Sequence, residues 1–141
     1  MKKLLLSSIL ISALCSCIIL FASCGGGIQS SEAKAHISEF FAAVVDEDYS
    51  KAEALLHPER PAELENFFLS IEEEKSIDFQ EGIEIKKYTG FSSSYYDSTV
   101  DGSTYELTME TTVGAKTVEF TIEIVKNENG YGIYNLDLNI Q

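Results

Sequence analysis

The residues that decide the fold are 105–124, which read YELTMETTVGAKTVEFTIEI. Apolar side chains stand at alternate positions on each side of the pair Gly114-Ala115. They are Tyr105, Leu107, Met109 and Val113 before this pair and Val118, Phe120, Ile122 and Ile124 after it. Because successive side chains of a strand point to opposite faces, the alternation predicts two strands that are each buried on one face. Glycine followed by alanine suits a two-residue type II′ turn, so the segment predicts an antiparallel hairpin.

Two registers of this hairpin are possible. A two-residue turn sets like charges against each other on the outer face, Glu110 against Glu119 and Glu106 against Glu123, which is destabilising. Carboxylates this close would suit a divalent cation or a basic partner. A longer loop over 114–117 pairs Val113 with Val118 and sets Glu110 against Thr121 and Thr108 against Glu123. We favour the longer loop, because it keeps the apolar faces matched without facing charges.

Two further strands flank this hairpin. Residues 83–96 predict a strand before it, and residues 97–103 predict the loop between the two. Residues 127–130 read NENG, a strong signal for a second hairpin. The last strand has one apolar face, formed by Tyr134, Leu136, Leu138 and Ile140. Tyr131 and Ile133 have the opposite parity, which predicts a bulge or loop near Gly132.

Residues 30–75 have the spacing of helices instead. Ser30 or Ser31 is expected to cap the first helix, whose apolar face consists of Ala33, Ile37, Phe40, Phe41, Val44 and Val45. A second helix is predicted over 49–56 and ends before Pro58. The third helix has Pro61 in its first turn, ends over 72–75, and buries Leu64, Phe67, Phe68 and Ile71.

Helices followed by antiparallel strands predict an α+β fold. We expect three N-terminal helices packed on one face of a curved four-stranded antiparallel sheet, in one domain over residues 31–141. The composition agrees with a folded domain, since 45% of the residues are hydrophobic and 23% are charged. The net charge of −13 makes nucleic acid a poor partner, because an acidic chain repels phosphate backbones.

The N-terminus has the pattern of an export signal. Lys2 and Lys3 precede an uncharged, apolar run over 4–22, and residues 21–24 read FASC. The small residues before this cysteine resemble the lipobox of bacterial lipoproteins. The resemblance implies a signal peptide over 1–23, lipid on Cys24 and a flexible, glycine-rich tether over 24–30. It also implies an exported protein that is anchored by its acyl chains to the extracytoplasmic side of a bacterial membrane, inner or outer.

Two alternatives to this anchor remain open. The apolar run approaches the length of a membrane span, so an uncleaved helix is the first. Modification of Cys17 is the second, although it leaves apolar residues 18–21 on the mature protein. All three cysteines, Cys15, Cys17 and Cys24, lie in this segment. The domain that follows therefore has no disulfide, thiolate metal site or cysteine nucleophile.

Two stretches of the domain resemble small exported bacterial members of the nuclear transport factor 2-like superfamily, whose cystatin-like fold is a cone. One is DYSKAEALLHPE over 48–59. The other is the ending over 118–136, whose GYGI at 130–133 lies where those proteins often have G-x-W-x-I. Tyr131 takes the place of the tryptophan, and the spacing is one residue shorter. The resemblance extends over about residues 31–140 and implies a cone-like sheet. The superfamily includes isomerases, dehydratases, transport adaptors and lipoproteins, so it decides no function.

Enzymes of this superfamily place Asp, His or Tyr inside the cone. The inward strand positions predicted here carry no proton-transferring group; they are Leu107, Met109, Phe120, Ile122, Leu136 and Leu138. His36 borders the apolar face of the first helix, and His57 ends the second, where the dipole favours a cation. We expect both histidines to be structural, and we assign no catalytic residue, no cofactor and no metal site.

The expected function is therefore that of a lipid-anchored binding or scaffold domain for a protein partner or a small ligand. A carrier that holds a small apolar ligand inside the cone is the first alternative, and a divergent isomerase or dehydratase is the second. A closed core filled by Phe40, Phe67 and Phe120 favours the binding domain, whereas an open apolar cavity favours the carrier.

Overall fold

The computed structural model describes residues 27–95 and 102–141. The predicted signal peptide, Cys24 and residues 24–26 of the tether lie outside these ranges, as do residues 97–101 of the predicted loop. Within the described ranges, no helix combines the length and the hydropathy that a bilayer crossing requires.

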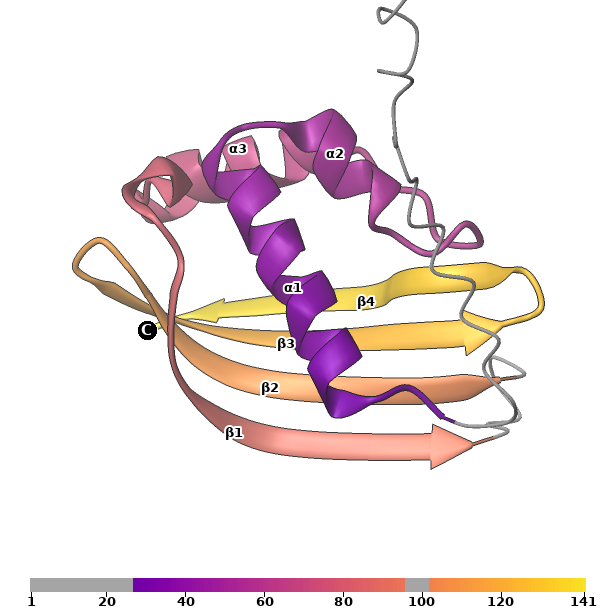
Figure 1. Cartoon of the computed structure of the whole chain (residues 1–141). Helices are drawn as coiled ribbons and strands as arrows, with labels where there is room; N and C mark the ends of the chain where they lie inside the picture. The colour runs from indigo at the N-terminus through magenta and orange to yellow at the C-terminus, as the bar shows by residue number, and fades with distance from the viewer. Residues whose placement is uncertain (1–26, 96–101) are drawn as a thin grey trace, which may run out of the picture.

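The chain folds as an α+β domain in which the helices precede the sheet, as predicted (Figure 1). The helical half contains α1 (Ser30–Val45), α2 (Tyr49–Ala54), α3 (Leu64–Lys75) and the short 3-10 helix η1 (Phe79–Glu81). The antiparallel sheet has the order β1-β2-β3-β4 and consists of β1 (Glu84–Tyr95), β2 (Ser103–Val113), β3 (Lys116–Asn127) and β4 (Gly130–Ile140). The three helices lie on one face of the sheet, and α1 runs diagonally across it.

The β2–β3 hairpin has the two-residue turn, so the favoured prediction of a longer loop is wrong. Val113 pairs with Lys116, and the glutamates face each other as Glu110 with Glu119 and Glu106 with Glu123. Gly114 has a φ of 56°, while Ala115 is not among the residues with positive φ, a combination that fits a type II′ turn. Such a turn matches the twist of the two strands, which favours this register.

One glutamate of each facing pair has a partner on a flanking strand, which offsets part of the repulsion within the pair. Glu110 lies with its Oε2 atom 3.2 Å from the Nζ atom of Lys87 in β1. Glu123 accepts a hydrogen bond through Oε1 from Nδ2 of Asn135 in β4, at 2.7 Å. Both partners come from outside the hairpin, so the sequence of the hairpin alone does not reveal them.

The edge strands are irregular, whereas the pairing of β2 with β3 is regular. β1 has one extra residue at Lys86 and another at Thr89, and β1 bends strongly along its length (Figure 1). β4 has an extra residue at Tyr134, between Ile133 and Asn135. The expected change in the face to which side chains point is therefore present, but it occurs at Tyr134, two residues after Gly132. The predicted inward position of Tyr134 is wrong, because the bulge gives that place to the buried Ile133.

The second and third helices are shorter than predicted. α2 ends at Ala54 because the next two residues, Leu55 and Leu56, pair through their backbone with β4. α3 begins at Leu64, so Pro61 lies before the helix and not in its first turn. Oε1 of Glu53 accepts the Leu64 N–H at 2.9 Å and so caps the start of α3. Residues 55–63 therefore form a long connection beside the sheet edge.

The helices and the sheet enclose an aromatic core. Its fully buried phenylalanines are Phe40 of α1, Phe68 of α3, Phe79 of η1 and Phe120 of β3. The ring of Phe68 contacts that of Phe79 edge to face, with 5.0 Å between centroids, and that of Phe40 at 6.2 Å. The prediction that Phe67 fills this core is wrong, because its side chain is 38% exposed. Phe68, its neighbour in α3, takes that place.

The two adjacent phenylalanines of α3 should differ sharply in their contribution to stability. We expect Phe68→Ala to lower the free energy of unfolding by about 3–5 kcal/mol, the usual cost of deleting a buried aromatic side chain. Phe67→Ala is the matched control and should cost about 1 kcal/mol, because its ring is only partly buried. Urea unfolding followed by circular dichroism measures both values. Equal losses would contradict the core described above.

Candidate binding site

The site is built where the chain leaves the helices and joins the edge of the sheet. Ile133 of β4 donates its N–H to the Leu55 carbonyl at 3.0 Å and accepts the His57 N–H at 2.8 Å. Leu56 lies between these bonds, in a parallel bridge with Ile133. The approach is closest at Gly132, where a Cβ atom would lie 2.6 Å from backbone atoms of Leu56 and His57. Only glycine permits this approach, because it has no Cβ.

His57 is fully buried and holds the turn that follows. Its Nδ1 atom accepts the Glu59 N–H at 3.2 Å, and its Nε2 atom lies 3.1 Å from Oδ1 of Asn127. Because Nδ1 accepts, the proton that Nε2 donates to Asn127 lies on the other nitrogen of the ring. The ring is thus held between the turn and the hairpin. His57 lies beyond the end of α2 at Ala54, and its ring is satisfied by other elements.

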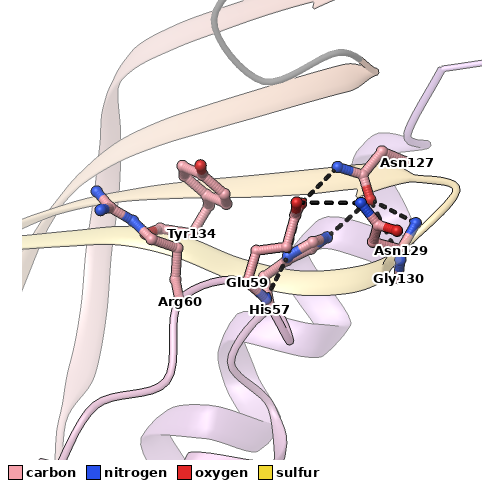
Figure 2. Close-up of polar contacts among 7 residues, drawn as sticks. All are labelled: His57, Glu59, Arg60, Asn127, Asn129, Gly130 and Tyr134. Carbon is pink, nitrogen blue, oxygen red and sulfur yellow. Dashed lines mark hydrogen bonds and ion pairs between the residues drawn. The ribbon is translucent and has the colours of Figure 1, made fainter.

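Asn127 and Glu59 fasten this turn to the β3–β4 hairpin (Figure 2). Oδ1 of Asn127 accepts the N–H groups of Asn129 and Gly130 as well as that of the His57 ring. The carboxylate of Glu59 accepts from Nδ2 of Asn127 at 2.8 Å and from Nδ2 of Asn129 at 3.0 Å. These bonds, chiefly the one from Asn127, hold the pKa of Glu59 below its ordinary value.

Arg60, the single arginine of the chain, directly follows Glu59 in this turn. Its guanidinium carbon lies 4.8 Å from the centre of the Tyr134 ring, and that ring contacts the buried ring of His57. Nε of Arg60 donates to the Tyr134 carbonyl at 3.3 Å, and a terminal nitrogen donates to Oδ1 of Asn135 at 2.7 Å. In Figure 2, Arg60 and Glu59 point in opposite directions from the turn. The guanidinium is therefore oriented although it is exposed.

Arg60 borders an open cleft of about 430 Å³ between the connection before α3, α3 itself and β4. Its apolar lining consists of Leu56, Pro61, Ala62, Leu64, Phe67, Ile133 and Leu136, and its polar lining of Arg60, Glu63, Tyr134 and Asn135. A group that enters the cleft would bury the exposed part of the Phe67 ring. An apolar surface beside one oriented cation suits a ligand that combines an apolar part with a carboxylate.

The second histidine and Tyr131 pack α1 against the start of β4. His36 donates from Nε2 to the Leu55 carbonyl at 2.8 Å, and its ring contacts that of Tyr131 edge to face at 4.9 Å between centroids. The Tyr131 hydroxyl is the one buried side-chain polar atom without a hydrogen-bond partner among the described residues. Burial, together with the carboxylate of Glu32, raises the pKa of Tyr131 far above its ordinary value.

The outer face of the sheet carries two pairs of facing glutamates, and one glutamate of each pair has a protein partner. Glu110 is held by Lys87, and Glu123 by Asn135. In residues 27–95 and 102–141, no group of three His, Cys, Asp or Glu side chains is arranged to hold a metal ion. The described residues therefore give no support to the cation site considered for the two-residue turn. Cys24, the one residue given a chemical role from the sequence, lies outside these ranges.

Sequence patterns did not single out Arg60, Asn135 or the bridging role of Asn127. A signal existed for Arg60, because it is the only arginine in an acidic chain and it lies between two prolines that interrupt helices. The NENG sequence predicted the hairpin that contains Asn127 correctly. It did not show that the side chain of Asn127 also forms a hydrogen bond with His57. No sequence signal linked Asn135 to the arginine.

The lowered pKa of Glu59 makes part of the stability depend on pH. A carboxylate whose pKa is lower in the folded chain stabilises the fold above its unfolded pKa, and the stabilisation is lost as the pH falls through the folded pKa. We therefore expect Glu59→Gln to lower the Tm at neutral pH, and the difference from the wild type to shrink in acid. Glu128→Gln, an exposed neighbour in the same hairpin, is the matched control and should change the Tm little. A difference that does not vary with pH would contradict this network.

No family model matches the chain, and no match is found among curated proteins or among solved structures. The resemblance to the nuclear transport factor 2-like superfamily therefore depends on the residues quoted for it and on the order of the elements.

Proposed function

We propose that the chain is an exported lipoprotein that is anchored through lipid on Cys24 and binds a partner on the extracytoplasmic side of a membrane, without catalysis. The anchor is supported by Lys2 and Lys3, by the apolar run over 4–22 and by the FASC sequence at 21–24. An acidic domain needs such a tether to stay at a membrane, because anionic headgroups repel it.

We further propose that residues 31–141 have the cone-like form of the nuclear transport factor 2-like superfamily. Support comes from the element order, in which three helices precede four antiparallel strands. The bend of β1 in Figure 1 is a second support, and the extra residues at Lys86 and Thr89 are the kind of irregularity that produces such a bend.

The filled interior favours a partner bound at the surface over a small ligand carried inside the cone. The rings of Phe40, Phe68 and Phe79 occupy the space between helices and sheet, where a carried ligand would lie. The cleft beside Phe67, in contrast, is open to solvent and admits a protruding group of another protein. A divergent isomerase or dehydratase is the weaker alternative, because inward residues such as Met109 and Phe120 do not transfer protons.

The observation that carries this proposal is the oriented guanidinium of Arg60 beside the exposed ring of Phe67. Tyr134 and Asn135 hold Arg60 in place, and helix α3 holds Phe67. Groups that are fixed before binding lose little conformational freedom on binding, so they contribute more to affinity. Arginine and aromatic side chains also dominate the energetics of many interfaces. We infer a protein partner that brings an apolar side chain to Phe67 and an acidic group to Arg60.

A pull-down of the lipidated protein from its native membrane tests the cleft. We expect Arg60→Gln and Phe67→Ala each to reduce the recovered partner about ten-fold, which corresponds to about 1.4 kcal/mol of binding free energy. The matched controls are Lys51→Gln, an exposed cation on α2, and Leu69→Ala, a 42% exposed apolar residue of α3; neither lines the cleft. Full recovery with both cleft variants, or equal loss with the controls, would contradict this site.

Incorporation of labelled palmitate tests the anchor. We expect label in the wild type and none in Cys24→Ser, because the sulfur of Cys24 is the atom that first receives the lipid, as a diacylglyceryl group in a thioether bond. Cys17→Ser is the matched control and should retain the label, which separates the two candidate cysteines. Label that persists in Cys24→Ser would refute the assignment, and an unlabelled wild type of unprocessed mass would favour the uncleaved helix.

A further inference from the structure

Aromatic side chains are exposed where α1 meets the edge strand β1. Phe91 is 65% exposed and Tyr88 is 42% exposed. Both side chains are on the sheet face that the helices cover, because they pair across the strands with the core residues Leu107 and Met109. β1 is at the edge of the sheet, and the helical layer leaves Phe91 largely uncovered and Tyr88 partly uncovered. Exposed rings of this size, close together, indicate an interaction surface.

Lys34 of α1 is the charged neighbour of these rings. Its Nζ atom lies 4.4 Å from the centre of the Tyr88 ring. Among the described residues no carboxylate lies within ion-pair distance of Lys34, whereas Lys86 and Lys87 of β1 are each paired with a glutamate. One cation without a carboxylate partner and two exposed aromatic rings therefore lie side by side on a strongly acidic chain.

These residues lie at the end of the domain where the proposed tether arrives. α1 begins at Ser30, so Lys34 is about one turn into the helix. Figure 1 shows this end of α1 near the ends of β1 and β2. Cys24 precedes Ser30 by six residues, which span at most about 20 Å when fully extended. A bilayer that holds lipid on Cys24 is therefore within reach of these side chains.

We propose that Lys34, Tyr88 and Phe91 form a membrane-facing patch that rests in the headgroup region and orients the tethered domain. The inference rests on the proposed lipid anchor. Aromatic rings and lysine stems favour the boundary between headgroups and acyl chains, and the ammonium group attracts anionic headgroups. Two rings alone bind a membrane weakly, but the tether keeps them at a high effective concentration beside it.

A second copy of the chain, paired edge to edge through β1, is the other occupant that this surface suggests. The bulges at Lys86 and Thr89 interrupt the row of backbone groups that such pairing needs. Lysines on an edge strand also oppose strand addition, because pairing would bring their charges together. The observations therefore favour the lipid surface over a second copy.

The experiment uses the absence of tryptophan from the chain, since a single introduced tryptophan reports on its own surroundings. The full-length lipidated Phe91→Trp protein is reconstituted into vesicles of phosphatidylcholine and phosphatidylglycerol with brominated acyl chains. We expect its emission to shift to the blue and to be quenched by the brominated lipid. Phe67→Trp replaces a partly exposed ring on α3, in the cleft, and is the matched control whose emission should not change. Lys34→Gln in the Phe91→Trp background should reduce the quenching.

Several outcomes would overturn the patch. Equal quenching of the two tryptophan variants shows that the domain has no preferred face toward the lipid, and quenching of neither shows that Phe91 does not reach it. A blue shift that grows with protein concentration and comes without quenching by the brominated lipid assigns the surface to a second copy. The acyl mass of the protein is measured in the same samples. A chain without acyl mass overturns the anchor and the patch together, whereas an acylated chain with an unquenched tryptophan overturns the patch alone.

Discussion

The backbone pairing of residues 55–57 with Ile133 is the constraint on which the cleft and its surroundings depend. It ends α2, because groups that bond to β4 do not also continue the helix. It requires Gly132, since a side chain there would meet the backbone of the connection. It also draws His57 into the interior, where Asn127 and the Glu59 N–H satisfy both ring nitrogens. What remains of the connection lines the cleft and presents Arg60.

The sequence predicted those parts of the fold in which the pattern of buried residues lies within a single helix or strand. Alternation along β2 and β3 identified the inward residues, and Met109, Phe120 and Ile122 are indeed fully buried. The register of the same hairpin was predicted wrongly, because the glutamates are accommodated by Lys87 and Asn135 on other strands. Periodicity also placed Phe67 and Phe68 on one face of α3. It did not show that β4 and the long connection would leave an open cleft beside the first of them.

Most of the candidate site could not be predicted from the sequence, because its contacts join elements that are far apart in the chain. Its central hydrogen bond joins His57 to Asn127, which lie 70 residues apart in the chain. Arg60 is oriented by Tyr134 and Asn135 across a similar separation. The position of Tyr134 in turn depends on the β4 bulge, which parity indicated only to within two residues. Local patterns thus located the turn and the hairpin separately, while the contact between them is a property of the folded chain.

The strand order β1-β2-β3-β4 has a consequence for the order of folding. Each strand pairs with its neighbour in sequence, so the sheet can form hairpin by hairpin with little loss of chain entropy at each step. The pairing of residues 55–57 is different, because it must wait for the last strand to be in place. The cleft, whose lining includes Ile133, Tyr134 and Leu136 of β4, is therefore complete only when β4 is in place. The partner binding that we propose for this cleft would in this way require the completed domain, so that a chain truncated before β4 presents no competing surface.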